Sequence, residues 1–438
     1  MEDWETLYQK KCVSAREALR HIPAHARVFL GHAANEPTAL LEALAAGYRD
    51  MEDVELINWL SLQDGMFCAP EMAGHFRYNA MFVSPSVRGA VQEERADYTP
   101  FFFHQTPQLF SDGSLPLDAA LVSVTPPDER GMVSLGTSVG GTLPACQNAR
   151  LVIAQVNDRL PRTFGDGSLP VSAFDYFVEA STPLPELPEA PIGEVEDAIG
   201  RHVAGLIEDG STIQLGIGSI PSAVLTHLRD KHDLGVHSEM LIDGIVDLVE
   251  RGVITGARKS IDRGKIVGAF MLGTRKIYDF ADRNPLVELR RVDYINHPAT
   301  IAQNSKMVSI NSCIQVDLDG QVNAESIDGR QFSGVGGQLD YVRGASLCPD
   351  GKAILAMPST ARHGAVSRIV PCFAAGTSVT TTRADVHYIV TEYGTVNLRG
   401  RSLKQRAKLL IGIAHPKFRR ELAQAYEERY REPLELDN

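Results

Sequence analysis

The sequence predicts an α/β protein with two similar open domains, each containing a mainly parallel sheet covered by helices. Short, nearly continuous apolar runs such as Leu151–Val156 and Ala353–Met357 are typical of strands buried on both faces. Segments with helical spacing of apolar residues alternate with these runs. A strand, a glycine turn, a proline and a helix follow one another over residues 27–44, and the same order returns over residues 212–228. This repetition indicates two related domains.

The elements follow from local patterns. Strands are expected at 27–31, 120–124, 151–156, 212–215, 265–270, 353–357 and 386–390, and helices at 37–44, 195–207, 221–228, 245–251, 402–413 and from Pro416 to about Arg431. Prolines at 183, 185, 188 and 191 block both helix and sheet between them and favour extended chain. We therefore expect an N-terminal domain over 1–185, a linker over 186–194 and a C-terminal domain over 195–438.

Composition narrows the possible functions. The chain has 438 residues, 44% of them hydrophobic, and a formal charge of −12 with no Lys/Arg run, which argues against nucleic acid as a partner. The six cysteines are scattered without a CxxC pair, and there is no HExxH motif, so no metal site or disulfide framework is indicated. No apolar stretch is long enough to cross a membrane, and the first residues are acidic where a secretory signal is basic. We expect a cytoplasmic protein.

Three turns are candidates for chemistry, because ligands of open α/β sheets bind beyond the carboxyl ends of the strands. The first is Gly216-Ile-Gly-Ser-Ile-Pro221, where two glycines allow close backbone approach and the following helix directs amide donors at negative charge. Pro221 replaces the third glycine of a dinucleotide fingerprint. A purely structural turn would have the same pattern.

The second turn is His237-Ser-Glu-Met240, which puts the carboxylate of Glu239 near the carboxyl end of a strand. An exposed loop glutamate on the surface is the alternative.

The third turn is the glycine cluster of Ser333-Gly-Val-Gly-Gly337, which fits either close approach to a ligand or an ordinary β-turn. Upstream of it, the amide of Asn311 ends an apolar run and either donates to an oxyanion or closes a turn.

Together these segments resemble the acetyl-CoA hydrolase/transferase family. The resemblance rests on Gly216–Pro221, His237–Met240, Ser309–Ser312, Gly320–Ala324 and Ser333–Gly337, and extends to Gly31-His-Ala-Ala-Asn-Glu-Pro37, Gly74-His-Phe-Arg77 and Thr391-Glu-Tyr-Gly394. It covers the chain from about Arg27 to Leu422. The most similar branch contains the CoA-transferases that act on 4-hydroxybutyrate and butyrate.

The resemblance implies a two-domain CoA-transferase with its active site at the domain interface. In it, Glu239 attacks an acyl-CoA thioester and Asn311 is an oxyanion donor. It places the CoA-binding residues at Gly216, Ile217, Gly218, Ser219, Ile220, Gly336, Gly337 and Ala361. Coenzyme A is then a substrate and not a permanently bound cofactor. The implied partners are acyl-CoA and a small carboxylic acid, and the implied assembly is a homodimer or a higher homo-oligomer.

A glutamate carboxylate is a suitable nucleophile for this exchange of thioesters. A glutamate with an ordinary pKa is ionised at neutral pH and attacks without a partner base, which accounts for the absence of a serine-hydrolase motif. We expect ping-pong exchange through a glutamyl-CoA thioester, with acetate, butyrate or 4-hydroxybutyrate as acids. Itaconate or succinate is an alternative, for which Arg77 could pair with the second carboxylate unless it forms a surface salt bridge. An acyl-CoA hydrolase and a non-catalytic CoA-binding protein also remain open.

Overall fold

The computed structural model describes residues 3–436, so the first two residues of the acidic N-terminal stretch lie outside the described residues. The chain forms two compact units. Unit 1 contains the chain up to Pro188 together with Ser238–Asp243 and Lys265–Asn296, and unit 2 contains Glu189–His237, Gly244–Gly264 and the chain from His297 onward. Within residues 3–436, no helix is both long enough and apolar enough to cross a membrane.

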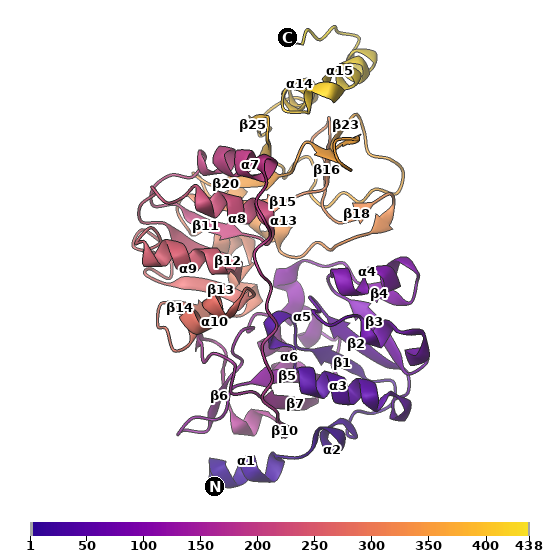
Figure 1. Ribbon diagram of the computed structural model, residues 1–438, viewed down its shortest axis with the longest axis vertical. Helices are drawn as coiled ribbons and strands as arrows, with labels where there is room; N and C mark the ends of the chain where they lie inside the picture. The colour runs from indigo at the N-terminus through magenta and orange to yellow at the C-terminus, as the bar shows by residue number, and fades with distance from the viewer. Residues whose placement is uncertain (1–2, 437–438) are drawn as a thin grey trace. The chain divides into compact units, whose positions relative to one another are not determined.

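Unit 1 is built around a seven-stranded sheet in the order β10-β7-β5-β1-β2-β3-β4, with parallel neighbours throughout. Strands β5 and β2, on either side of the central β1, are buried along their whole length, and helix α3 crosses one face of the sheet (Figure 1). The chain runs outward from β1 to β4 on one side and then returns to β5 on the other side. The carboxyl ends of β1 and β5 therefore form a topological switch point, the usual ligand position of such sheets.

The elements of unit 1 run as follows: α1 (Trp4–Lys11), α2 (Ala15–Leu19), β1 (Arg27–Leu30), α3 (Thr38–Ala46), β2 (Val54–Asn58), β3 (Phe76–Ala80), α4 (Pro85–Gln92), β4 (Ala96–Tyr98), α5 (Thr106–Ser111), β5 (Ala119–Val124), β6 (Met132–Ser134), α6 (Thr142–Asn148), β7 (Leu151–Val156), β8 (Phe164–Gly165), β9 (Ser168–Pro170), β10 (Tyr176–Glu179), β13 (Ile266–Met271), α10 (Arg275–Ala281), β14 (Val287–Leu289) and α11 (Val292–Ile295). Strands β13, β14 and β8 form a further parallel ladder in that order.

Unit 2 contains a second parallel set in the order β24-β20-β15-β11-β12, with β25 added antiparallel at the edge. Its elements are α7 (Glu194–Ala204), β11 (Thr212–Leu215), α8 (Ser219–Thr226), β12 (Gly235–Leu241), α9 (Asp243–Glu250), α12 (Pro298–Ile301), β15 (Met307–Ser312), β16 (Gln315–Asp317), β17 (Val322–Asn323), β18 (Ser326–Ile327), β19 (Arg330–Gln331), α13 (Gln338–Leu347), β20 (Lys352–Ala356), β21 (Thr360–Ala361), β22 (Val366–Ser367), β23 (Ile369–Val370), β24 (Tyr388–Thr391), β25 (Gly394–Asn397), α14 (Leu403–Gly412) and α15 (Pro416–Tyr430). The last residues of β12 and the first of α9 belong to unit 1.

The predicted α/β class with large parallel sheets is confirmed. The repeated order also holds, because β1 leads into α3 and β11 leads into α8, each through a short turn. Pro37 directly precedes α3 and Pro221 lies in the first turn of α8, where a missing backbone N–H costs nothing. The proline-rich segment has no helix or strand over residues 180–193. The domain boundaries expected from the sequence remain a prediction.

Candidate active site

Glu239 lies on strand β12 and not in a turn. The predicted turn at His237–Met240 was wrong, because β12 continues through these residues to Leu241. His, Ser and Glu residues in a row favour a loop in a sequence-based prediction, but His237 and Ser238 are almost completely buried. They belong to β12, whose first residues pair in parallel with β11. Of the seven residues of β12, all of which the structure describes, Glu239 alone keeps partial exposure. The strand therefore holds the carboxylate on a rigid element next to solvent.

A buried asparagine binds this carboxylate. Asn296, which follows helix α11, donates from Nδ2 to Oε2 of Glu239 at 2.5 Å. Asn296 is 0% exposed, and its buried Oδ1 has no hydrogen-bond partner among the residues that the structure describes. Since a carboxylate only accepts hydrogen bonds, the contact fixes the orientation of the amide with its NH₂ group toward Glu239. Asn296 therefore orients one oxygen of Glu239 and leaves the other outside this contact.

Asp243 fixes the carboxyl end of β12. Its carboxylate accepts hydrogen bonds from the backbone N–H of Thr274 at 3.0 Å, from Oγ1 of Thr274 at 2.7 Å and from the backbone N–H of Ile277 at 3.1 Å. These donors lie where β13 leads into α10, so the carboxylate ties that turn to the end of the strand bearing Glu239. The sequence analysis did not select Asp243 or Asn296. Each lies beside an element boundary, where such residues usually cap or turn.

In unit 2, a turn over Gly216–Gly218 follows β11 at the carboxyl edge of the sheet, and the predicted residues Ser219 and Ile220 are the first two of helix α8. Gly218 has φ +113° and ψ −177°, a conformation almost restricted to glycine, and α8 begins at Ser219. Ile217 is 43% exposed. A Cβ added at Gly216 or Gly218 would have no neighbour within 4 Å, so the backbone here faces open space. The turn thus presents exposed backbone and an exposed apolar side chain beside a helix start.

Asn311 lies near the end of β15, the neighbour of β11. Its amide forms a reciprocal pair with Gln214, since Asn311 Nδ2 donates to Gln214 Oε1 at 3.0 Å and Gln214 Nε2 donates to Asn311 Oδ1 at 3.2 Å. Gln214 Oε1 also accepts from the backbone N–H of Ile310 at 3.2 Å. One N–H of Asn311 is used in this pair, and an amide nitrogen carries two. The pair holds the plane of the Asn311 amide at the sheet edge.

The third predicted segment lies at the same edge. Gly336 adopts a positive φ of 53°, and Gly337 directly precedes α13. The first residue of α13, Gln338, donates from Nε2 to the carbonyl oxygen of Ser312 at 2.7 Å. That bond ties the glycine turn to the end of β15, one residue beyond Asn311.

Ala361 lies on the short hairpin of β21 and β22, which follows β20. Before it, the backbone N–H of Ser359 donates to Oε2 of Glu392 at 2.8 Å and Ser359 Oγ donates to Oε1 at 2.5 Å. The motif Thr391–Gly394, noted in the sequence, thus supplies a carboxylate that fixes the turn before Ala361. Strands β11, β15 and β20 are parallel neighbours, so the predicted CoA-binding segments and Asn311 gather along one sheet edge of unit 2.

Arg77 forms surface ion pairs. Its Nε lies 2.5 Å from Oδ1 of Asp53, and the side chain is 49% exposed. Arg77 is the second residue of β3 and therefore lies near the amino end of that strand, away from the edge where ligands bind. The salt-bridge interpretation is confirmed. Across residues 3–436, no group of three or more His, Cys, Asp or Glu side chains is arranged to hold a metal ion.

Glu36 and His32 lie in the motif that follows β1, and both are buried. Both oxygens of Glu36 accept from the backbone N–H of Leu62 at 3.2 Å, and burial raises the pKa of Glu36 to about 7. His32 pairs with Oγ of Ser138 through Nε2 at 2.8 Å, and burial lowers its pKa to about 3. His32 is therefore neutral at physiological pH.

Known proteins similar to this chain identify its family. Residues 1–187 match the acetyl-CoA hydrolase/transferase N-terminal domain, and residues 273–426 match the C-terminal domain of that family. The chain is 50% identical to a 4-hydroxybutyrate coenzyme A transferase of Clostridium kluyveri, over 98% of this chain and 100% of that protein. It is 46% identical to a succinyl-CoA:acetate/propanoyl-CoA:succinate CoA transferase of Fasciola hepatica, over 91% of this chain and 84% of that protein.

The fold of this chain is also similar to that of a solved structure. The crystal structure of RipA from Yersinia pestis has a TM-score of 0.94 and 37% identity, and the match covers 98% of this chain and 100% of that one. The resemblance inferred from the sequence motifs is thereby confirmed. The chain belongs to the acetyl-CoA hydrolase/transferase family of enzymes, and the family members most similar to it in these comparisons include CoA transferases.

Proposed function

We propose that this chain is an acyl-CoA:carboxylate CoA-transferase that moves CoA between short-chain carboxylic acids, with Glu239 as the nucleophile. The observation that carries the proposal is the placement of Glu239, which is the one partly exposed residue of a buried strand and is oriented by the buried amide of Asn296. A rigid element holds a catalytic group more accurately than a loop does. The names of the similar transferases support the reaction class.

The reaction starts when a carboxylate oxygen of Glu239 attacks the thioester carbon of acyl-CoA. The C–S bond breaks, CoA leaves as the thiolate, and a mixed glutamyl–acyl anhydride forms. The thiolate then attacks the glutamyl carbonyl carbon. The anhydride C–O bond breaks, the first acid departs as its carboxylate, and Glu239 carries CoA as a thioester.

A second carboxylate runs the sequence in reverse. Its oxygen attacks the glutamyl carbonyl and releases the thiolate, which then attacks the acyl carbonyl of the new anhydride. New acyl-CoA departs and the carboxylate of Glu239 is restored. Both protein–substrate intermediates are labile to water, so the site must exclude it, or CoA is hydrolysed off.

The residues at the sheet edge of unit 2 fit the remaining roles. We assign the second N–H of the Asn311 amide to the oxyanion of the tetrahedral centres, because the pair with Gln214 already fixes the amide plane. We assign Gly216–Ile220, Gly336, Gly337 and Ala361 to binding of CoA. Exposed backbone at Gly216 and Gly218 supports this assignment, since no side chain of the protein fills that space.

For the acid, the observations favour a linear short-chain carboxylate of the acetate, butyrate or 4-hydroxybutyrate type. Arg77 was the residue that favoured a dicarboxylic acid, and its guanidinium is paired with Asp53. The name of the Clostridium kluyveri transferase supports 4-hydroxybutyrate, whereas the Fasciola hepatica name includes succinate. Competing the four acids against one acyl-CoA donor ranks them directly.

We also propose that the enzyme works in the cytoplasm as a homodimer or a larger homo-oligomer, with CoA entering and leaving as a substrate. The six cysteines are all free thiols, which fits a reducing compartment. Light scattering of the purified protein measures the assembly. A monomer would contradict this part of the proposal.

The test of the function compares wild type, Glu239→Gln and a matched Glu71→Gln control at an exposed position. We expect acid-dependent CoA exchange with parallel-line ping-pong kinetics in wild type and the control, and none in Glu239→Gln. Thiol release without an acceptor acid, monitored in the same assay, would instead indicate a hydrolase. Exchange retained by Glu239→Gln would reject the assignment.

A further inference from the structure

Unit 1 contains a cavity that the proposed reaction does not use. It has a volume of about 440 Å³, within the range of roughly 300–1,000 Å³ common for small-molecule sites. Its walls are the segments after β5 and β7 and the helix α10 with the two residues that follow it. The carboxyl ends of two neighbouring parallel strands thus open into it, which is the position where such sheets bind ligands.

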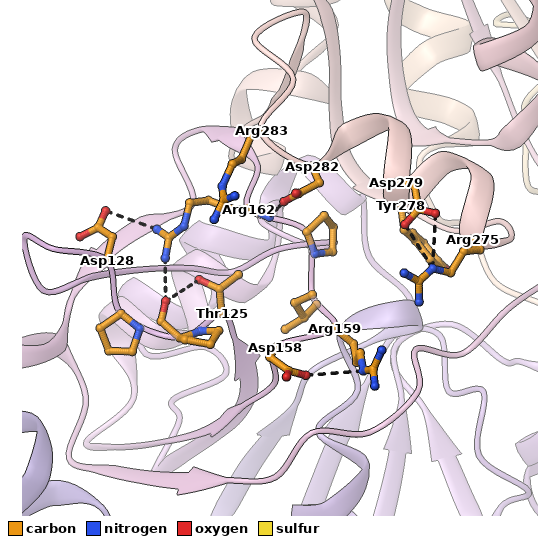
Figure 2. Close-up of a pocket in the computed structure, with 14 residues that line it drawn as sticks. Thr125, Asp128, Asp158, Arg159, Arg162, Arg275, Tyr278, Asp279, Asp282 and Arg283 are labelled. Atoms are coloured by element: carbon orange, nitrogen blue, oxygen red, sulfur yellow. Dashed lines mark hydrogen bonds and ion pairs between the residues drawn. The ribbon is translucent and has the colours of Figure 1, made fainter.

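Four arginines line the cavity, two from the segment after β7 and two from α10 and the residues that follow it. Figure 2 shows Arg162 and Arg283 on one side of it and Arg159 and Arg275 on the other. Three of them have acidic partners: Arg162 lies 3.5 Å from Asp128, Arg159 lies 3.6 Å from Asp158, and Arg275 lies 3.1 Å from Asp279. Guanidinium groups reaching one space from several directions suit a tetrahedral anion, which offers an acceptor on every side.

Arg283 is different from the other three. It is exposed, and among residues 3–436 no group forms a hydrogen bond or an ion pair with its guanidinium nitrogens. Arg162, in contrast, also donates to the carbonyl oxygens of Pro126 and Met132, so its guanidinium is occupied by the protein. The fork of Arg283 is therefore the donor of the cavity that an incoming anion can take without breaking a contact.

The backbone holds Arg283 in place at a cost. Its φ is +50°, in the left-handed region where glycine or asparagine is normally found. Two hydrogen bonds lock this conformation: the backbone N–H of Arg283 donates to the carbonyl oxygen of Arg162 at 2.9 Å, and the backbone N–H of Arg162 donates to Oδ1 of Asp282 at 2.8 Å. Arg283 directly follows the C-cap of α10, and these two bonds fix where its side chain starts at the cavity wall.

The rest of the lining suits a molecule larger than inorganic phosphate. Three prolines, Pro126, Pro127 and Pro161, give rigid walls with apolar surface. The carboxylates of Asp158 and Asp279 are hydrogen-bond acceptors at the rim, of the kind that recognises hydroxyl or amino groups. A space of this size would be mostly unfilled by one phosphate ion.

We propose that this cavity is a second ligand site of the protein, which recognises a phosphoryl group through Arg283, as carried by a nucleoside phosphate. It differs from the proposed CoA site, whose residues all belong to unit 2. Arg283 would bind the free phosphate ion through the same hydrogen bonds as the phosphoryl group of a nucleoside phosphate. The test therefore compares these two ligands. Unit 1 would then bind a phosphorylated metabolite at this cavity, while unit 2 binds CoA.

The test is calorimetric titration of the full chain with ADP, with and without CoA. ADP that binds as a fragment of CoA at the proposed site of unit 2 is recognised because it does not depend on Arg283, which belongs to unit 1. Inorganic phosphate is titrated separately. We expect ADP to bind wild type, at least tenfold more weakly to Arg283→Ala, and with an intermediate loss to Arg283→Lys, which keeps the charge without the fork. Arg420→Ala, at an exposed position of α15, is the control and should bind ADP as wild type does.

Each variant is first checked for an unchanged rate of CoA exchange, which shows that it is folded and keeps the proposed function separate from this site. Binding of phosphate alone with the same dependence on Arg283 would identify the free ion as the ligand. Failure of both probes to bind wild type, or equal binding to wild type and Arg283→Ala, would overturn the proposal.

Discussion

The carboxylate of Glu239 and the amide of Asn296 lie 2.5 Å apart, Oε2 to Nδ2, with Asn296 completely buried. We predict that Asn296→Ala lowers kcat by roughly 10- to 100-fold, since a hydrogen bond to a charged group contributes about 1.5–3 kcal/mol. The KM for acyl-CoA should change little, because the amide orients the nucleophile and does not contact CoA in this account. Initial-rate kinetics with varied acyl-CoA measure both constants.

Asn148→Ala is the control for this change. Its amide donates to the carbonyl oxygen of Pro144 within helix α6, so the substitution removes an asparagine without touching Glu239. It should leave kcat unchanged. An unaltered kcat in Asn296→Ala would show that the orientation of Glu239 does not depend on this amide.

The pair formed by Asn311 and Gln214 gives a second prediction. Removing an oxyanion donor typically lowers kcat by about 10²–10³-fold, so Asn311→Ala should show a loss of that size. Gln214→Ala removes only the support of the amide plane and should cause a smaller loss. The ratio of the two kcat values, measured at saturating substrates, distinguishes the donor from its support. Equal losses would assign Asn311 a purely structural role.

Substitutions at Gly216 and Gly218, which are two positions apart, distinguish the effect of backbone strain on stability from the effect of a lost contact on CoA binding. Gly218→Ala forces alanine into φ +113° and should reduce the free energy of unfolding by about 1–3 kcal/mol. Gly216 lacks a positive φ and its Cβ would meet no atom of the protein, so Gly216→Ala should leave stability unchanged. If CoA approaches this turn closely, Gly216→Ala should still weaken CoA binding. Denaturant melts and CoA titrations of both variants measure these effects, and wild-type CoA affinity in Gly216→Ala would place CoA elsewhere.

The buried carboxyl of Glu36 predicts a pH dependence of stability. Burial raises its pKa from 4.5 to about 7, so the folded protein binds this proton more tightly than the unfolded chain does. The contribution of Glu36 is therefore fully present below about pH 4.5 and is lost as pH rises through 7, by up to about 3 kcal/mol.

Glu36→Gln removes this titration. Relative to wild type, the free energy of unfolding of the variant should rise between pH 4.5 and 8, whereas the exposed Glu71→Gln control should show no such trend. Urea denaturation across that range gives the differences. A difference between Glu36→Gln and wild type that stays constant with pH would mean that Glu36 is ionised in the folded protein throughout.

The sequence predicted the parallel α/β architecture correctly. It did not predict where the strand that carries Glu239 ends. Strands such as Leu151–Val156 are apolar along their whole length, so pattern and structure agree. The strand bearing Glu239 contains His237, Ser238 and Glu239, and its pairing in the sheet overrides the weak strand preference of these residues. Polar residues within a buried strand are thus where local patterns fail and where a functional site is expected.

The partners of the site residues could not be predicted in the same way. Asn296 is 57 positions from Glu239 and Gln214 is 97 positions from Asn311, and no local pattern links residues so far apart. Glu392 is the exception, because it belongs to the motif Thr391–Gly394 that was already noted. The hydrogen bond from Ser359 to Glu392, however, could be found only in the three-dimensional structure.

The central claim is that Glu239 carries CoA as a covalent thioester during turnover. The most direct measurement is mass spectrometry of the protein after incubation with acyl-CoA in the absence of an acceptor acid, followed by peptide mapping. The account predicts a CoA-sized adduct on the peptide containing Glu239, which disappears on addition of a carboxylic acid as new acyl-CoA forms. An adduct on another residue, or efficient exchange with Glu239 unmodified and replaceable by Gln, would contradict it.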